Sequence, residues 1–152
     1  MCGIVGYAGR RRAAPLIIDG LRRLEYRGYD SFGVATVASR VAADKRCGRI
    51  PANLPDTRSM KGTLGIGHTR WATHGAPSDE NAHPHTDCSG RIAVVHNGII
   101  ENYASLRKKL EKKGHAFRSE TDTEVIAHLV EEHYQGDLRR AVEDAVKSLE
   151  GS

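Results

Sequence analysis

The sequence predicts an α+β fold in one domain, and two patterns indicate this class. About five short apolar runs with strand character fall in the first two-thirds of the chain. Apolar stripes at helical spacing appear once near the N-terminus and then dominate the last third. The 152 residues, 39% hydrophobic and 28% charged, suffice for one sizeable core.

The first strand is expected from Cys2 to Tyr7, a short apolar run bounded by Gly9. A helix follows from about Pro15, because apolar residues then recur at helical spacing up to Leu24. The helix should end before Gly28, where a turn leads into a second strand at 33–37.

Residues 38–61 are the least patterned part, and we expect a loop with one short strand near 47–50. Residues 63–68 predict a strand whose two glycines indicate a close backbone approach. The unperiodic stretch 69–90 is too long for an ordinary connection, so it is expected to be functional.

The last third begins with an apolar strand at 91–96 and a turn at Asn97-Gly98. A short strand is expected at 115–118, after Gly114 as a helix C-cap. Three helices are expected at 101–113, 123–133 and 138–149.

Composition excludes several classes of function. The net charge is +4 and the pI about 9.1, with no helix-turn-helix, RNP or zinc-finger pattern, so no nucleic-acid partner is expected. No apolar run reaches a membrane span, and no signal peptide is expected. Cys2, Cys47 and Cys88 are too irregularly spaced for a disulfide framework, which favours the cytoplasm.

Cys2 is the first residue with catalytic potential. If Met1 is removed, Cys2 carries an α-amine with a pKa of about 7.7–8.0 and a thiol near 8.5. A base beside a nucleophile on one residue is the unit that N-terminal nucleophile hydrolases use. Taken alone, Cys2 is better interpreted as an unremarkable N-terminal cysteine, and the rest of the chain must decide.

Three polar loops at strand ends could complete a site. Arg70 could hold a carboxylate with two parallel hydrogen bonds beside the wall of Trp71, or the pair could be a stacked surface contact. Asn97 and Gly98 could form an oxyanion hole or a hairpin turn. Asp122 could hold an ammonium group or cap a helix.

A metal site was weighed at Asn81 to Cys88, which contains His83, His85, Asp87 and Cys88. The spacing matches no standard structural zinc pattern, and no second ligand pair is evident. The sequence therefore predicts neither a metal nor a cofactor.

Six segments in order resemble the glutaminase domain of the glucosamine-6-phosphate synthase family, the isomerising glutamine:fructose-6-phosphate aminotransferases, which are class II glutamine amidotransferases. These segments are Cys2 to Tyr7, Leu24 to Ser31, Gly67 to Gly75, Asn81 to His85, His96 to Asn102 and Ser119 to Glu124. The resemblance implies an N-terminal nucleophile hydrolase fold, a four-layer αββα sandwich with mainly antiparallel sheets.

The resemblance also implies a role for each matching position. Cys2 would attack the side-chain amide of glutamine, with its α-amine as proton shuttle, and Asn97 and Gly98 would form the oxyanion hole. Arg70 would bind the substrate carboxylate and Asp122 its ammonium. The pocket wall and the loop that closes on glutamine would be shaped by Trp71, Thr73 and His74. Arg27 would brace the N-terminal site.

The implied reaction yields glutamate and ammonia through a γ-glutamyl thioester. In the full-length enzyme, expected to be a homodimer, ammonia passes to a sugar-phosphate isomerase domain and aminates fructose 6-phosphate. Residues 1–152 would then be a glutaminase domain incomplete at its C-terminus, without the isomerase domain. The alternative is a catalytically incompetent fragment that at most binds glutamine or needs a partner chain.

Two departures from the family pattern accompany the resemblance. Phe32 stands where a small residue is usual, and overpacking there could cost about 1–3 kcal/mol. The loop from Ser39 to Lys61 is shorter than usual, which should be tolerated.

Overall fold

The computed structural model describes residues 2–53, 57–72 and 75–152. Its larger sheet has the strand order β1-β4-β2-β3, and all three neighbouring pairs are antiparallel. The bounds are β1 Gly3–Ala8, β2 Ser31–Val37, β3 Val41–Cys47 and β4 Leu64–Arg70. A second sheet pairs β5 (His85–Thr86) with β6 (Ala93–Val94).

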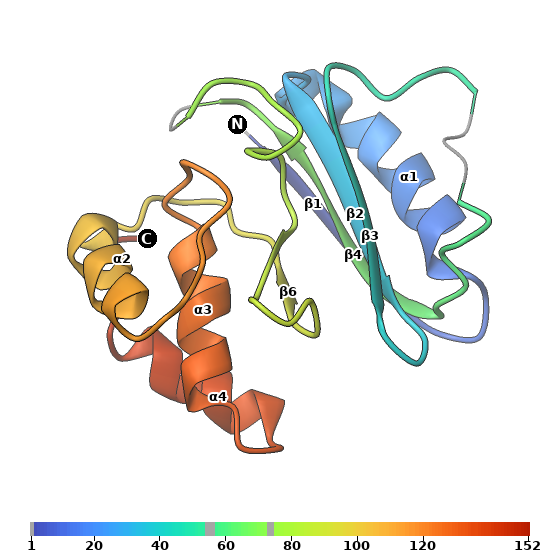
Figure 1. Ribbon diagram of the computed structural model, residues 1–152. Coiled ribbons are helices and arrows are strands. Elements are labelled where there is room, and N and C mark those ends of the chain that lie inside the picture. Colours follow the sequence, from blue (N-terminus) through green and yellow to red (C-terminus); the bar gives the residue numbers. More distant parts are fainter. Residues whose placement is uncertain (1, 54–56, 73–74) are drawn as a thin grey trace.

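The helices lie outside the two sheets. Figure 1 shows α1 (Ala13–Leu24) on one face of the larger sheet, with β6 and then α3 (Glu124–His133) on the other side. The remaining helices are the short 3-10 helix η1 (Glu25–Arg27), α2 (Tyr103–Lys112) and α4 (Leu138–Val146). The order helix, sheet, sheet, helices gives four layers and confirms the α+β expectation.

Glycines let α1 lie close to β4. A Cβ at Gly67 would lie 2.9 Å from Leu21 Cδ1 and would also clash with Ile17. A Cβ at Gly65 would lie 2.9 Å from Ile17 Cδ1. The close approach expected for this strand is confirmed, and it seals the first core between α1 and the sheet. Phe32 is buried in that core.

A second apolar core joins the three C-terminal helices, and it contains Leu106, Leu110, Val125, Leu129, Ala141 and Ala145. The chain leaves α2 through Gly114 at φ +98°. The amide of His115 donates to the Leu110 carbonyl at 3.1 Å, and the amide of Gly114 donates to the Glu111 carbonyl at 3.0 Å. This is the hydrogen-bond pattern of a Schellman motif. The expected C-cap is confirmed.

Several predicted bounds are wrong. The strand expected near 47–50 is β3 at Val41–Cys47, which pairs with β2 over its whole length. The strand expected at 91–96 shrinks to β6, paired with β5 inside the predicted long loop. Residues 115–118 form no strand, because their polar groups face Cys88 and Glu124 instead of another strand. The last helix ends at Val146.

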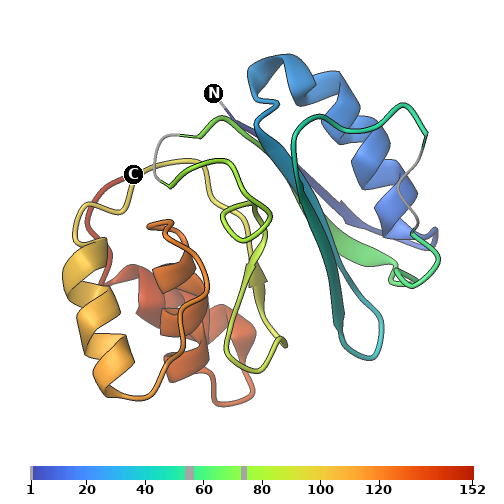
Figure 2. The same cartoon turned by 45° about the horizontal axis from the view of Figure 1, so that its top comes forward.

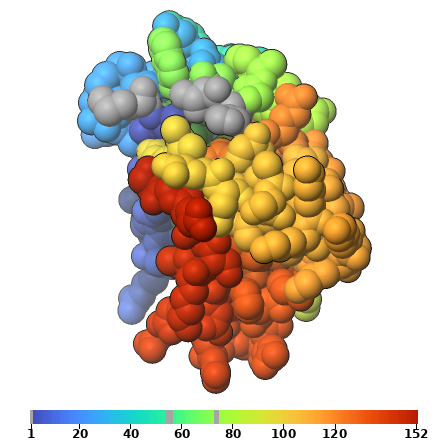
Figure 3. All heavy atoms as spheres, turned by 90° about the vertical axis from the view of Figure 1, so that its left-hand side faces the viewer, coloured from blue at the N-terminus to red at the C-terminus, as the bar shows by residue number. Residues whose placement is uncertain are grey.

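The two ends of the chain lie toward the same end of the molecule (Figure 2). Ile99 and Ser152 exchange two backbone hydrogen bonds, at 2.9 and 3.1 Å. Figure 3 shows the C-terminal residues in dark red against the yellow segment. The segment after Asn97 is therefore held from one side by residues 150–152.

Candidate active site

Strand pairing places the first two site residues together. Cys2 directly precedes β1 and Arg70 ends β4, and the register pairs Gly3 with Thr69. Trp71, Asn97, Gly98 and Asp122 join Cys2 and Arg70 around one cavity of about 40 Å³. Six residues that the sequence patterns predicted from four separate segments thus share one site.

The Cys2 sulfur lies in a defined setting. The amide of Trp71 points at Cys2 Sγ at 3.3 Å, and the Asn97 side-chain amide donates to the Cys2 carbonyl at 3.1 Å. The Trp71 carbonyl also lies 3.7 Å from Cys2 Sγ, so the backbone of Trp71 contacts the sulfur through both its polar groups. The site thus combines a nucleophile with amide donors close to it.

His68 sets the orientation of Asn97. His68 Nε2 lies 2.8 Å from Asn97 Oδ1. Burial lowers the pKa of His68 to about 4, so its ring is neutral near pH 7. A neutral ring can meet an amide oxygen only through an N–H, so Nε2 carries the proton. The amide nitrogen of Asn97 is thereby left to face Cys2.

The segment Asn97-Gly98 does not form the two-residue hairpin that Asn-Gly often indicates. A type I′ turn needs positive φ at both central residues, and no non-glycine residue in the described chain has one. Gly98 is also absent from the positive-φ glycines. The hairpin interpretation is wrong.

A buried cation and a buried anion line the cavity together. Arg70 and Asp122 are 4% and 6% exposed. Burial lowers the pKa of Arg70, and the negative charges of Cys2, Asp30 and Asp122 oppose that shift. An α-amino acid carries an anionic and a cationic group on one carbon, so this pair of charges matches it chemically.

Asp122 does not cap α3. Its Oδ2 accepts a hydrogen bond from the amide of Ile100 at 2.7 Å, and the N-cap position is Thr123, without a side-chain cap. The capping interpretation is therefore wrong. The carboxylate instead joins the loop before α3 to the segment that follows Gly98.

The other predicted residues differ in their placement. Trp71 is 45% exposed and meets Tyr29 edge-on, with ring centroids 5.5 Å apart. The Arg27 guanidinium lies over the Tyr26 ring, 5.8 Å from its centroid, and its role as a brace stays a prediction. Thr73 and His74 lie outside the described residues.

Asp30 and Gly28, for which no role is predicted from the sequence, both hold the Arg70 loop. The Asp30 carboxylate accepts from the Ala72 amide at 2.9 Å, and the Asp30 amide donates to the Arg70 carbonyl at 3.0 Å. A Cβ at Gly28 would lie 2.8 Å from the backbone of Arg70 and Trp71. The one sequence signal for these two residues is their position in Leu24 to Ser31, a segment that resembles the family.

Three buried histidines fill the space between the two sheets near the site. His83 stacks on His68 at 4.2 Å and meets His85 at 4.6 Å, measured between ring centroids. Burial lowers the pKa of His83 well below its usual value and that of His85 to about 3. These rings are neutral near pH 7, so they do not compete with Arg70 for an anion.

The segment Asn81 to Cys88 does not gather into a single metal site. His83 and His85 belong to the buried histidine group with His68. His85 Nε2 lies 2.9 Å from Thr121 Oγ1. Asp87 accepts from the amides of Arg91 and Ile92, both at 2.7 Å. Cys88 lies with other residues, described below.

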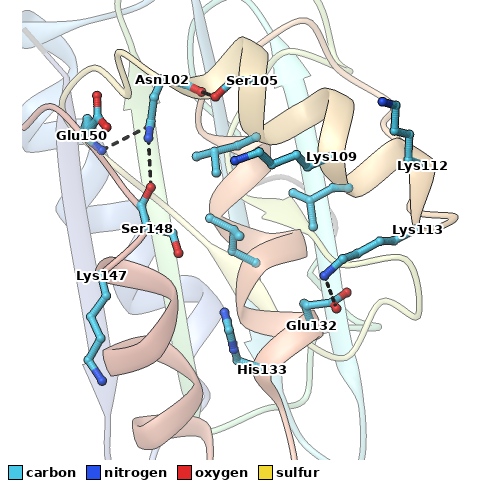
Figure 4. Close-up of a pocket in the computed structure, with 13 residues that line it drawn as sticks. Asn102, Ser105, Lys109, Lys112, Lys113, Glu132, His133, Lys147, Ser148 and Glu150 are labelled. Atoms are coloured by element: carbon cyan, nitrogen blue, oxygen red, sulfur yellow. Dashed lines mark hydrogen bonds and ion pairs between the residues drawn. The ribbon is translucent and has the colours of Figure 1, made fainter.

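A much larger hollow lies elsewhere. A groove of about 970 Å³ runs between α2, α3 and the C-terminal segment, and Figure 4 shows its lysines and Glu132. Asn102 crosses it by donating to the Ser148 carbonyl at 2.9 Å. None of the six clustered site residues lines this groove, so it is separate from the cysteine site.

The layers and the cysteine at the start of β1 define a domain of the N-terminal nucleophile hydrolase type. Two solved structures support this fold. One is the Bacillus subtilis glutamine phosphoribosylpyrophosphate amidotransferase, with TM-score 0.80 and 29% identity over 99% of this chain and 33% of that one. The other is an allosteric regulatory enzyme of purine biosynthesis, with TM-score 0.84 and 29% identity over 100% of this chain and 34% of that one.

The family model for the glutamine amidotransferase domain matches residues 55–143. The chain therefore belongs to the glutamine amidotransferase domain family. It is 64% identical to the isomerizing glutamine–fructose-6-phosphate aminotransferase of Symbiobacterium thermophilum and 57% identical to that of Thermus thermophilus. In both cases all of this chain matches 26% of the relative, so it spans about a quarter of their length.

Within the described residues, no helix is both long and apolar enough to cross a membrane.

Proposed function

We propose that this chain hydrolyses glutamine to glutamate and ammonia. One observation supports the proposal above all: Cys2, Arg70, Asn97, Gly98 and Asp122 line one cavity. Glutamine has a carboxylate, an ammonium and a reacting amide, and the cavity offers one partner for each. Arg70 binds the carboxylate and Asp122 the ammonium, which places the amide at Cys2.

The chemistry follows from this arrangement. The Cys2 thiolate attacks the amide carbon, and the oxyanion is bound by Asn97 Nδ2 and the Gly98 amide. The α-amine of Cys2, free once Met1 is removed, takes up the thiol proton and passes it to the leaving nitrogen. The C–N bond breaks, ammonia leaves, and a γ-glutamyl thioester remains. Water then cleaves the thioester to give glutamate and the free thiol.

Substrate entry requires the walls to move. The cavity of about 40 Å³ is small beside the roughly 300–1,000 Å³ of ordinary ligand pockets. Trp71 is an exposed member of the lining, as are Asn97 and Gly98, and the Trp71 backbone amide faces the sulfur. Movement of the Trp71 segment would open the site and release the sulfur together.

We further propose that the ammonia serves the amination of fructose 6-phosphate by a sugar-phosphate isomerase domain, in a cytoplasmic homodimer. The names of the relatives and their fourfold greater length support the amination and the additional domain. Under this proposal, residues 1–152 are a glutaminase domain that is incomplete at its C-terminus.

A second candidate is a chain that needs a partner segment to act. Val37, Leu64, Leu138 and Val142 are exposed and line an apolar cavity of about 360 Å³ at the open edge of the layers. Exposed apolar surface of this kind favours binding of another segment or chain that covers it.

Glutamate release from glutamine by the purified chain tests the first candidate. Cys2→Ala should abolish release, and Cys47→Ser, at an exposed cysteine outside the cavity, should not. Equal activity of Cys2→Ala and the parent would refute the mechanism, and Met1 retained in an active protein would refute the α-amine role. A folded, inactive parent whose Cys2 is still alkylated by a diazoketone analogue of glutamine would favour the second candidate.

A further inference from the structure

Cys88, His115, His128 and Glu131 form a second chemical cluster outside the cysteine site. They come from three segments: the loop after β5, the segment after α2, and α3. Each residue offers one ligand atom, and all four atoms lie within 4.8 Å of one another. His128 is buried and Cys88 is at the surface, so a small ion could enter from solvent.

Four of the six distances among these ligand atoms are close to those expected around a tetrahedral metal ion. Cys88 Sγ lies 3.5 Å from His128 Nδ1 and 3.7 Å from His115 Nδ1. Glu131 Oε2 lies 3.0 Å from His115 Nδ1 and 3.3 Å from His128 Nδ1. Zinc bonds of about 2.0–2.3 Å at tetrahedral angles separate ligand atoms by about 3.3–3.6 Å.

Both histidines turn their second nitrogen toward a carboxylate. His115 Nε2 lies 3.0 Å from Glu132 Oε2, and His128 Nε2 lies 3.6 Å from Glu124 Oε1. Metal-bound histidines usually donate their other N–H to a carboxylate, which fixes the tautomer. The His115 contact is within hydrogen-bond distance, whereas His128 Nε2 lies near Glu124 without a hydrogen bond. Figure 4 shows that Glu132 also receives Lys113, at 2.7 Å, so the outer carboxylate is itself anchored.

The arrangement around Glu131 needs a positive charge. If His115 donates through Nε2 to Glu132, a neutral ring presents the Nδ1 lone pair to Glu131 Oε2, and two acceptors then face each other. A cation between them removes the conflict. The alternative is a doubly protonated His115 held between two carboxylates, with no metal.

We propose that Cys88, His115, His128 and Glu131 bind one structural Zn²⁺. The thiolate and carboxylate neutralise the ion, and Cys88 releases its thiol proton on binding. Four protein ligands complete a tetrahedron and leave no open position, as in structural sites. Sequence reading expected no metal, because His115 and His128 lie far from Cys88 along the chain.

The site would brace the loop that carries Asp122. The ion would fix His128, whose Nε2 lies 3.6 Å from Glu124 Oε1. The Glu124 carboxylate accepts from the amides of Arg118 at 2.8 Å and Ser119 at 2.7 Å. Those residues begin the loop that leads to Asp122. The proposal itself does not depend on glutamine hydrolysis.

Metal-free protein titrated with Co²⁺ and then with Zn²⁺ tests the proposal. We expect one equivalent of Co²⁺ to produce a thiolate-to-cobalt charge-transfer band and tetrahedral d–d bands, and Zn²⁺ to displace it. Zn²⁺ should also raise the melting temperature. Cys88→Ser should lose the charge-transfer band and the thermal shift, and His115→Gln should weaken affinity at least tenfold.

Cys47→Ser is the matched control, since Cys47 is also an exposed free cysteine and lies outside the cluster. It should bind Co²⁺ like the parent. A charge-transfer band that survives in Cys88→Ser would place the metal elsewhere, at Cys2 for example, and overturn the proposal. Absence of stoichiometric binding to the folded parent would also overturn it and leave His115 as a protonated bridge.

Discussion

His68 Nε2 lies 2.8 Å from Asn97 Oδ1, and this contact determines which end of the Asn97 amide faces Cys2. If the amide flipped, its oxygen would face the Cys2 carbonyl and its NH₂ would face the N–H of a neutral histidine. Both contacts would be repulsive. His68 is thus a positioning residue for the proposed oxyanion hole.

Replacement of His68 tests this positioning. His68→Gln keeps an N–H at the place of Nε2 and should retain kcat within about tenfold, whereas His68→Leu should lower kcat about 10²-fold or more with little change in KM. Asn97→Ala should cost on the order of 10²–10³ in kcat. A double-mutant cycle measures the coupling, and additive losses for His68→Leu and Asn97→Ala would contradict it.

Asp122→Asn tests the ammonium contact. Asparagine keeps an oxygen for the Ile100 amide, so the fold should survive, but the charge is lost. We expect KM for glutamine to rise about 10–100-fold. Glutaramate, which lacks the α-amino group, provides the matched substrate. The parent should prefer glutamine over glutaramate, and the variant should lose most of that preference; an unchanged preference would assign the ammonium to another group.

Arg70→Lys tests the carboxylate contact. Lysine keeps the charge but not the planar fork that binds a carboxylate through two hydrogen bonds. KM for glutamine should rise about tenfold or more, measured from the initial rate of glutamate release. Arg139→Lys, on the exposed face of α4, is the control and should leave KM unchanged. An unaltered KM in Arg70→Lys would remove Arg70 from the proposed substrate contacts.

Acid should destabilise the protein through its buried histidines. Burial lowers the pKa of His68 to about 4, below the value of about 6.5 in the unfolded chain. Below pH 6.5 the unfolded state therefore binds a proton that the folded state refuses, and stability falls as pH drops toward 4. For His68 the full loss is on the order of 3 kcal/mol.

Urea unfolding at a series of pH values measures this loss. His68→Gln should be less stable than the parent at pH 7.5. Its free energy of unfolding should fall less steeply between pH 6.5 and 4, because about one proton fewer is taken up on unfolding. His133→Gln, at the end of α3 and not fully buried, is the control and should keep the parental slope. Parallel pH curves for His68→Gln and the parent would show that His68 is not buried in its neutral form.

Local patterns predicted the long elements well. α1, α2 and α3 each carry an apolar stripe that packs into one of the two cores, and β1 and β4 lie within two residues of their expected bounds. The short strands failed, because a two-residue pair such as His85 with Val94 owes its existence to a partner distant in sequence. Periodicity carries no information about such partners.

The sequence by itself determined the motifs and their order, and hence the family and the residues proposed for glutamine. Apart from Asp122, those residues stand beside strand ends or glycines, where short-range chemistry is readable. Only the tertiary structure showed that Asp122 meets Ile100, that His68 orients Asn97, and that Cys88 gathers with His115, His128 and Glu131. These contacts join segments 22 to 43 residues apart, and they form only when the layers bury both sides of each pair.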